Sequence, residues 1–220
     1  MDAFEVMKER HSVRQYTDKR IEEKTRAILN DYIEELNTEG KLNIQIFYDE
    51  PECFNSMMAR YGHFENVNNY IAMVGPKEKS LDERCGYYGE KLVLKAQELG
   101  LNTCWVGLTH GKTKTVVKRG EKETIIISLG YGKTQGVPHH SKDIRKIADL
   151  KDDDPEWYRR GIEAVLLAPT AINQQKFYFS RKDNIVSASS TSHAAYTRMD
   201  LGIAKCHFEL GAGKENFRWK

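Results

Sequence analysis

Two short segments of this chain carry side chains that could hold a phosphorylated cofactor. The first, residues 10–14, is called the clamp below, and it places Arg10, Ser12 and Arg14 at alternate positions. In an extended chain, alternate residues point to the same side, which would leave Val13 facing the core. Arginine binds phosphate through bidentate, charge-assisted hydrogen bonds. The spacing therefore suits a phosphate dianion. Two surface arginines beside a turn serine would show the same pattern, and the spacing taken alone favours this plainer interpretation.

The second segment, Pro169–Gln175, is called the amide turn, and it joins an expected helix to an expected strand. Pro169 fixes the backbone, and Asn173 and Gln175 alternate. A primary amide supplies both donors and an acceptor, which matches the mixed edge of a pyrimidine-like ring. A connecting loop whose amides satisfy backbone groups is the alternative interpretation. The segment taken alone favours this alternative.

Composition limits the classes of protein that the chain can belong to. A chain of 220 residues can bury a sizeable core as one domain. Its 34 basic and 32 acidic residues leave a net charge of +2, so no nucleic-acid partner is expected. No apolar run of ~18 residues occurs, and we expect no membrane span. The four cysteines form no C-x-x-C pair, and no signal segment begins the chain, which fits a cytoplasmic protein.

Hydrophobic periodicity predicts an alternation of helices and strands. A short amphipathic helix is expected at residues 2–10, and Thr17 or Asp18 is expected to cap a helix that runs to about Asn37 and ends at Gly40. Further helices are predicted at 83–100, 156–167 and 196–210. Strands are predicted at 42–47, 70–75, 103–107, 124–130, 176–180 and 184–188.

A weak internal repeat accompanies this order. Residues 21–47 joined to 85–100 show a helix, a strand and a helix that ends in glycine, and residues 156–180 joined to 198–211 show the same order. Leu99-Gly100 and Leu210-Gly211 close the two longer helices alike. Chance produces such a match often, so duplication and coincidence both remain open.

Two other motifs do not survive inspection. Gly132-Lys133-Thr134 resembles the end of a phosphate loop, but the pattern requires glycine at the position of Ile127. His139 and His140 are adjacent and would point apart in an extended loop, and no carboxylate or cysteine joins them at a known ligand spacing. No metal site is predicted.

Together the clamp and the amide turn resemble motifs of the FMN-dependent nitroreductases. The clamp resembles the phosphate-binding start of that family, and Ala168–Gln175 resembles its A-P-S-A-x-N-x-Q-P turn, with Thr170 in place of serine and Lys176 in place of proline. Residues 90–107 are similar to the central helix and the W-x-G strand of the family, and residues 129–132 to its G-Y-P strand end. The resemblance implies an α+β fold with a central, mostly antiparallel sheet flanked by helices.

The resemblance also implies roles for individual residues. Arg10, Ser12 and Arg14 would hold the FMN phosphate, and His11 would lie beside the ribityl chain. Pro169, Thr170 and Asn173 would contact the ring or the ribityl chain from the other side. Val106 and Gly107 would lie near the ring, and Lys142 or His140 would supply a late basic contact to the phosphate. No side chain would act as a catalytic nucleophile or base, because the flavin carries the chemistry.

One departure from the family suggests how the site is assembled. In the family the turn follows the second helix, but here that place is taken by residues 36–42, and the turn lies some 130 residues downstream. Family members form dimers in which one subunit supplies the clamp and the other supplies the turn. We therefore expect a monomeric pseudo-dimer rather than a homodimer, with a nitroreductase-like half at residues 1–150, a second half at 151–220 and a single FMN site.

The implied activity is reduction of nitroaromatic, quinone or similar electron-poor acceptors by NAD(P)H through flavin N5. A flavin-binding protein, or a degenerate one without turnover, is the alternative that the replaced proline leaves open. A specialised flavin oxidase or dehalogenase on the same fold would show the same sequence features.

Overall fold

The computed structural model describes residues 2–220, which divide into two compact units. The sheet unit comprises residues 9–81 and 91–137. The helix unit comprises the N-terminal residues up to Lys8, residues 82–90 and residues 138–220. These units interleave along the chain, whereas the halves expected from the sequence, 1–150 and 151–220, are contiguous.

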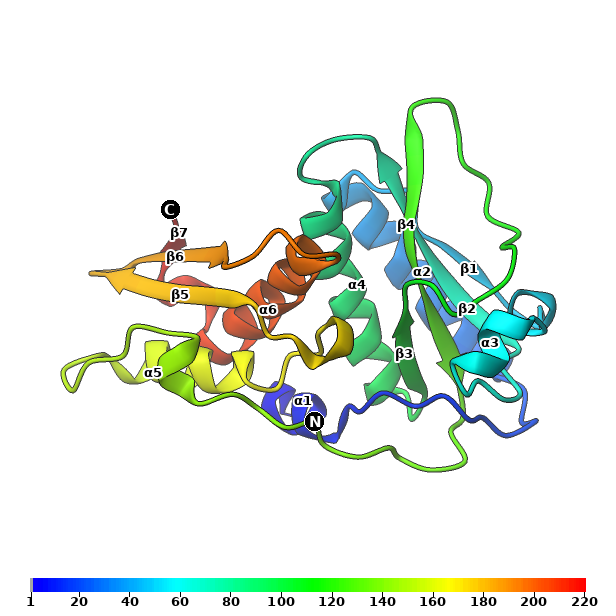
Figure 1. Ribbon diagram of the computed structural model, residues 1–220, viewed down its shortest axis with the longest axis horizontal. Coiled ribbons are helices and arrows are strands. Elements are labelled where there is room, and N and C mark those ends of the chain that lie inside the picture. Colours follow the sequence, from blue (N-terminus) through cyan, green and yellow to red (C-terminus); the bar gives the residue numbers. More distant parts are fainter. Residues whose placement is uncertain (1) are drawn as a thin grey trace. The chain divides into compact units, whose positions relative to one another are not determined.

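Six α-helices and seven strands are found in the described part of the chain (Figure 1). The helices are α1 (Ala3–Glu9), α2 (Glu23–Gly40), α3 (Met57–Tyr61), α4 (Leu81–Glu98), α5 (Glu156–Val165) and α6 (Thr197–Ala212). The strands are β1 (Gln45–Phe47), β2 (Asn69–Pro76), β3 (Asn102–Val106), β4 (Glu121–Gly130), β5 (Phe177–Lys182), β6 (Ile185–Ser190) and β7 (Arg218–Trp219).

The sheet unit is organised around a four-stranded antiparallel sheet of order β1-β2-β4-β3. Strand β2 is buried along nearly its whole length, as its continuous apolar sequence predicts for a strand covered on both faces. Its register with β4 pairs Ile71 with Ile127 and shifts at a bulge between Met73 and Val74. This sheet, with its flanking helices, confirms the predicted α+β fold.

One hydrophobic cluster of the sheet unit joins the clamp to the sheet. It contains Val13 from the clamp, Ala59 from α3, Tyr70 from β2 and Val106 from the end of β3. Each is less than 4% exposed. The clamp is therefore anchored through the side chain between Ser12 and Arg14.

Helix α2 begins later than its sequence suggests. The predicted caps, Thr17 and Asp18, lie outside it, and its N-cap is Glu22, which makes no side-chain capping bond. Backbone bonds explain the difference, because Tyr16 N donates to Glu65 O (3.1 Å) and Thr17 N donates to Tyr131 O (2.8 Å). These contacts keep the chain extended where local propensity would start a helix.

The core of the helix unit is aromatic. Phe208 of α6 stacks on Phe179 of β5 with ring centroids 5.4 Å apart, and it meets Phe217 and Trp219 edge-on or tilted at 5.0 and 5.4 Å. Strands β5 and β6 form the predicted hairpin, and β7 pairs parallel to β6. Figure 1 shows this small sheet beside α5 and α6.

A buried ion pair links three helices in this unit. His207 of α6 and Glu90 of α4 are both fully buried, and His207 Nε2 lies 2.9 Å from Glu90 Oε1. The other ring nitrogen, Nδ1, lies 3.0 Å from the carbonyl oxygen of Ala164 in α5. Because a carbonyl oxygen only accepts, Nδ1 must carry a proton, and a second proton is shared between Nε2 and the carboxylate.

Helices α4 and α6 cross at a pair of glycines. A Cβ atom added at Gly86 would overlap the carbonyl oxygen of Met199 and lie 3.1 Å from Ile203 N. A Cβ atom added at Gly202 would overlap the carbonyl oxygen of Glu83 and lie 2.8 Å from Tyr87 N. Only glycine permits so close an approach of two backbones.

This crossing is isologous. Met199, Gly202 and Ile203 each lie 116 positions after Glu83, Gly86 and Tyr87, so each glycine meets the counterpart of what the other one meets. The same offset relates the first residues of α4 and α6, Leu81 and Thr197, and those of β3 and β7, Asn102 and Arg218. Such reciprocity is the mark of a two-fold axis between like elements.

The reciprocal contacts relate α4 and α6 at an offset of 116, a register different from the one that the sequence suggested. Matching Leu99-Gly100 with Leu210-Gly211 implies an offset of 111. In the structure Gly211 lies inside α6, against the backbone of Arg160 and the side chain of Ala164, and Gly213 is the residue that ends the helix with a positive φ of 76°.

We expect the Gly202→Ala substitution to lower the free energy of unfolding by about 3 kcal/mol, because the methyl group would force two backbones apart. Urea denaturation followed by circular dichroism would measure the change. Glu163→Ala, at an exposed position of α5, is the control and should change stability by less than about 0.5 kcal/mol. Equal stability of the Gly202 variant and the wild type would contradict the close crossing.

Candidate cofactor site

The clamp runs alongside β3 in the sheet unit. Ser12 forms an isolated parallel bridge with Thr103, and Val13 N donates to Thr103 O at 3.0 Å. Val13 is buried, whereas Ser12 and Arg14 are exposed. The expected alternation is therefore present at these three positions.

Arg10 is only 4% exposed, whereas Ser12 and Arg14, the other two polar residues of the clamp, are exposed. All three polar residues of the clamp nevertheless act on one atom, the sulfur of Cys104. Burial raises the pKa of the Cys104 thiol, and the charge of Arg14, a hydrogen bond with the Ser12 side chain and the charge of Arg10 each oppose the rise. Cys104 thus lies within electrostatic reach of both arginines, and the convergence of the three side chains on a phosphate stays a prediction.

A polar loop after β4 supports the clamp from one side. His11 Nδ1 lies 3.0 Å from Gln135 O, and Asn102 Nδ2 donates to Gln135 Oε1 at 3.0 Å. Gly136 has a φ of 73°, and a Cβ atom there would lie 2.7 Å from the His11 Cβ. Sequence reasoning missed Asn102, Gln135 and Gly136, and the glycine after a polar run was the signal available.

Val106 and Gly107, the residues expected near the ring, lie at the end of β3. Val106 is 1% exposed and shares the hydrophobic cluster with Val13. Gly107 is half-buried, immediately after the strand. The clamp and the end of β3 are thus brought together by one core.

In the helix unit, the amide turn holds a strained backbone. Ile172, Asn173 and Gln175 have positive φ angles of 47°, 56° and 43°. A β-branched residue in this region is a genuine outlier, and Ile172 is also 97% exposed. Strain of this kind persists only where the surroundings over-determine it, and it concentrates at functional sites.

Hydrogen bonds within the turn and to a neighbouring loop impose this conformation. The side-chain amides of Asn173 and Gln175 both donate to His140 O, at 2.9 and 2.8 Å, and Gln175 Nε2 also donates to Asn173 Oδ1. Gln175 N donates to Thr170 Oγ1 at 3.1 Å. These amides satisfy backbone groups, as the simpler interpretation of the segment predicts.

Lys142 belongs to the same network. Its ammonium group donates to the carbonyl oxygens of Gln174 (2.8 Å) and Gln175 (3.0 Å), and its backbone N donates to Gln175 Oε1 at 2.8 Å. The charge of Lys142 is thus used in holding the turn. Pro169 is half-buried at the start of the turn.

A buried carboxylate that the sequence did not reveal fixes the turn from below. Asp200, on the first turn of α6, is 2% exposed. Its Oδ1 accepts from Ala171 N at 3.0 Å, and its Oδ2 accepts from Gln174 Nε2 at 2.7 Å. Burial raises the pKa of Asp200 to about 6, although both hydrogen bonds favour the charged form. Within a helix, an aspartate reads as an ordinary polar position, so its role emerges only from the fold.

The structure therefore assembles the predicted residues into two groups. Arg10, His11, Ser12 and Arg14 lie with Val106 and Gly107 in the sheet unit. Pro169, Thr170 and Asn173 lie with Lys142 in the helix unit. Their contacts with a cofactor stay predictions.

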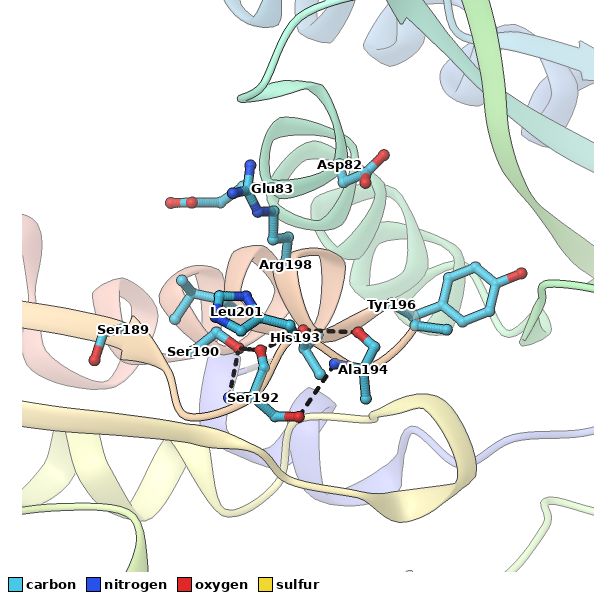
Figure 2. A pocket seen from close by; sticks show the side chains of 12 residues that line it. Asp82, Glu83, Ser189, Ser190, Ser192, His193, Ala194, Tyr196, Arg198 and Leu201 are labelled. Carbon is cyan, nitrogen blue, oxygen red and sulfur yellow. Dashed lines mark hydrogen bonds between the residues drawn. The ribbon is translucent and has the colours of Figure 1, made fainter.

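The helix unit also contains a cavity of about 650 Å³ that no predicted site residue lines. Figure 2 shows it between the first turn of α4, with Asp82 and Glu83, and the segment that leads into α6, with Ser192, His193 and Arg198. Glu83 is paired there with Lys205.

Two further searches covered the described residues. In residues 2–220, no three His, Cys, Asp or Glu side chains lie close enough together to bind a metal ion. No helix in that range combines the length and the apolar character needed to cross a membrane.

The Asp200→Asn substitution should reveal the buried charge through pH. Because the folded pKa of about 6 exceeds the ordinary 3.8, folding favours the protonated carboxyl. This carboxyl therefore costs nothing at low pH, and its cost grows to about 3 kcal/mol as pH rises through about 4 to 6. Relative to the wild type, the variant should be about 2 kcal/mol more stable near pH 7.5 than near pH 4.5, because part of the cost is already present at pH 4.5.

Urea unfolding at the two pH values would measure this difference, with Asp152→Asn, an exposed carboxylate, as the control. A difference between variant and wild type that does not change with pH would show that Asp200 titrates normally.

Comparisons with known proteins place the chain in a family. A family model described as "Putative TM nitroreductase" matches residues 2–212. No curated protein matches the chain.

Several solved structures share the fold. A structure described as a putative nitroreductase from Thermotoga maritima has a TM-score of 0.72 at 23% identity and covers 98% of this chain and 85% of its own. A putative nitroreductase in complex with FMN from Desulfovibrio desulfuricans has a TM-score of 0.55 at 17% identity, covering 70% and 99%. A putative NADH oxidase from Clostridium acetobutylicum has a TM-score of 0.51 at 16% identity, covering 68% and 99%.

At these identities the structural likenesses show the nitroreductase fold, and the match of the family model over residues 2–212 shows the membership. The chain belongs to the family described as putative TM nitroreductases.

Proposed function

We propose that this protein is an FMN-dependent oxidoreductase that uses NAD(P)H to reduce nitroaromatic, quinone or similar electron-poor acceptors. Family membership and the fold shared with an FMN-bound structure support the proposal. The observation that carries it is the clamp, a segment with two arginines and a serine at alternate positions that runs alongside β3.

The chemistry of the clamp fits a phosphate group. Arg14 and Ser12 are exposed, and the Arg14 guanidinium forms no ion pair with any residue in 2–220. Arg10 adds a second, buried positive charge on the same segment. A phosphate dianion would meet the exposed Arg14 guanidinium and the Ser12 hydroxyl, with the charge of Arg10 on the same segment.

The amide turn, in the helix unit, is a further candidate segment for cofactor contact. Its tip, Thr170–Asn173, is partly or fully exposed, and the network around Asp200 and Lys142 holds it in one conformation. A rigid turn binds a ligand without first losing conformational entropy. Thr170 and the exposed Ile172 are the side chains available for contact.

When bound, FMN supplies the hydride chemistry, accepting from NAD(P)H and donating to the acceptor at N5. The residues of this chain bind and orient. Arg10, Ser12 and Arg14 would hold the phosphate of FMN, His11 would contact its ribityl chain, and Val106 and Gly107 would contact its ring. We assign no proton transfer to a side chain.

The glycine crossing supports a single-chain pseudo-dimer. The family resemblance implies a dimer in which the clamp and the turn come from two identical subunits, with two sites per dimer. Here the clamp occurs in one half and the turn in the other, and α4 and α6 meet reciprocally as two copies of one helix would. One FMN per chain follows.

A flavin-binding protein without turnover is the second candidate. The hydrogen bonds from Asn173 and Gln175 to His140 favour it, because they use amide hydrogens that could otherwise recognise a ring. Lys176, in place of the family's proline, points the same way.

The visible absorption of the purified protein tests the function directly. After incubation with FMN and removal of excess, we expect a flavin band that bleaches on anaerobic addition of NADPH or NADH and returns when a quinone is added. We expect one flavin per chain, and a bound ratio of two would refute the pseudo-dimer. A bound flavin that no reduced nicotinamide bleaches would favour the second candidate.

Substituting Arg14 tests the role of the clamp. Losing one charged hydrogen-bonding partner of the phosphate corresponds to about 1.5–3 kcal/mol, so Arg14→Ala should weaken FMN binding roughly 10- to 100-fold. Riboflavin, which lacks the phosphate, should bind the variant and the wild type alike. Arg119→Ala, an exposed arginine outside the clamp, is the control. Equal losses for FMN and riboflavin would place the phosphate elsewhere.

A further inference from the structure

An exposed apolar patch lies in the sheet unit, on α3 and on the residue after Gly107. Met57 is 85% exposed, Met58 47%, Tyr61 77% and Leu108 73%. These four side chains are called the α3 patch. Large apolar side chains that gather in this way on a protein surface mark an interaction site.

The two parts of the patch are held together by direct contacts. A Cβ atom added at Gly62, just after α3, would lie 2.7 Å from the Thr109 side chain. Gly111 N donates to Cys53 O at 2.6 Å, and a Cβ atom on Gly111 would lie 3.1 Å from the Ser56 Cβ. The segment that follows β3 therefore packs along α3 and carries Leu108 with it.

The patch and the clamp are both attached to the same hydrophobic cluster. The buried residue of α3, Ala59, belongs to the same hydrophobic cluster as Val13 of the clamp and Val106 of β3. Leu108 follows Gly107, where the proposed function puts the flavin ring. The patch thus borders the ring end of the proposed site, on the core that the clamp itself uses.

The chemistry of the patch favours a flat aromatic ligand. Methionine sulfur makes favourable contacts with aromatic rings, and a tyrosine ring stacks on other rings. A branched aliphatic patch would lack this preference.

Charge near the patch favours an anion. Arg60 on α3 and Lys112 after β3 are exposed, and neither forms an ion pair with any residue in 2–220. The neighbouring carboxylates, Glu50 and Glu52, are paired with Lys114 at 3.4 and 3.5 Å. Glu50 and Glu52 share the single cation Lys114, so Arg60 and Lys112 leave a small net positive charge beside the patch.

We propose that the α3 patch is the seat of the electron-poor acceptor, and that it prefers flat aromatic acceptors that carry a negatively charged substituent. This inference rests on the proposed function and names the substrate class for the same site. A second copy of the chain is a weaker occupant, because stable protein interfaces bury about 800 Å² on each partner and the patch has four side chains.

Binding of anthraquinone-2-sulfonate to the full chain, measured by isothermal titration calorimetry, tests the proposal without relying on turnover. The double variant Met58→Ala/Tyr61→Ala should bind this probe at least about 10-fold more weakly, the equivalent of about 1.4 kcal/mol. Arg60→Ala should weaken binding of the sulfonated probe and leave binding of the neutral 2-methyl-1,4-naphthoquinone unchanged. Val116→Ala, an exposed apolar residue outside the patch, is the control.

In the FMN-loaded protein, the double variant should raise the KM for the acceptor while the rate of flavin reduction by NAD(P)H stays unchanged. Unaltered probe binding in the double variant would overturn the proposal. A difference in gel-filtration volume between the wild type and the double variant would also overturn it, because it would indicate that a second copy of the chain binds at the patch. If the probe binds at the patch but no flavin binds or bleaches, the proposed function fails and the patch assignment stands.

Discussion

The close crossing of α4 and α6 is the constraint on which the helix unit depends. Two backbones approach at Gly86 and Gly202 so closely that any side chain at either position would overlap a carbonyl oxygen. Further along the same helices, Glu90 and His207 form a pair that is wholly shielded from water and tied to α5. A buried pair of this kind is strongly destabilising when broken, so a shift at the glycines would propagate to all three helices. The amide turn is held by Asp200 at the start of α6, so a shift of α6 would also move the turn.

In the amide turn, polar groups fix the conformation of the backbone instead of remaining available to bind a ligand. Its side-chain amides, Lys142 and Asp200 satisfy one another and the backbone, and the result is an exposed isoleucine in a left-handed conformation. Specificity at such a site comes from the fixed position of a few exposed atoms. The clamp follows the opposite logic, since Arg14 and Ser12 stay accessible and are positioned by the burial of the valine between them.

Sequence patterns predicted the fold class and nearly every long element. Continuous apolar runs identified β2 and β4, and helical periodicity placed α4 and α6 within a few residues of their observed bounds. Features set by distant contacts were not predictable. Helix α2 begins later than predicted because backbone hydrogen bonds hold Tyr16 and Thr17 in an extended conformation. The role of Asp200 depends on its contact with a turn that lies 29 positions earlier. The clamp is a prediction from spacing and from the family resemblance, and the burial of Arg10 and the influence of the clamp on Cys104 required coordinates.

The reciprocal crossing has a consequence for how this molecule can change. In a homodimer, every substitution at a symmetry axis appears twice, so both sides of the contact are altered at once. With the two copies on one chain, Gly86 and Gly202 are separate genetic positions, and each can be altered while the other is kept. A mutation therefore changes one side of the contact alone. One half of the chain can lose ligand contacts while the other half gains them. The two glycines stay under joint constraint, because a change at either one alters the same crossing.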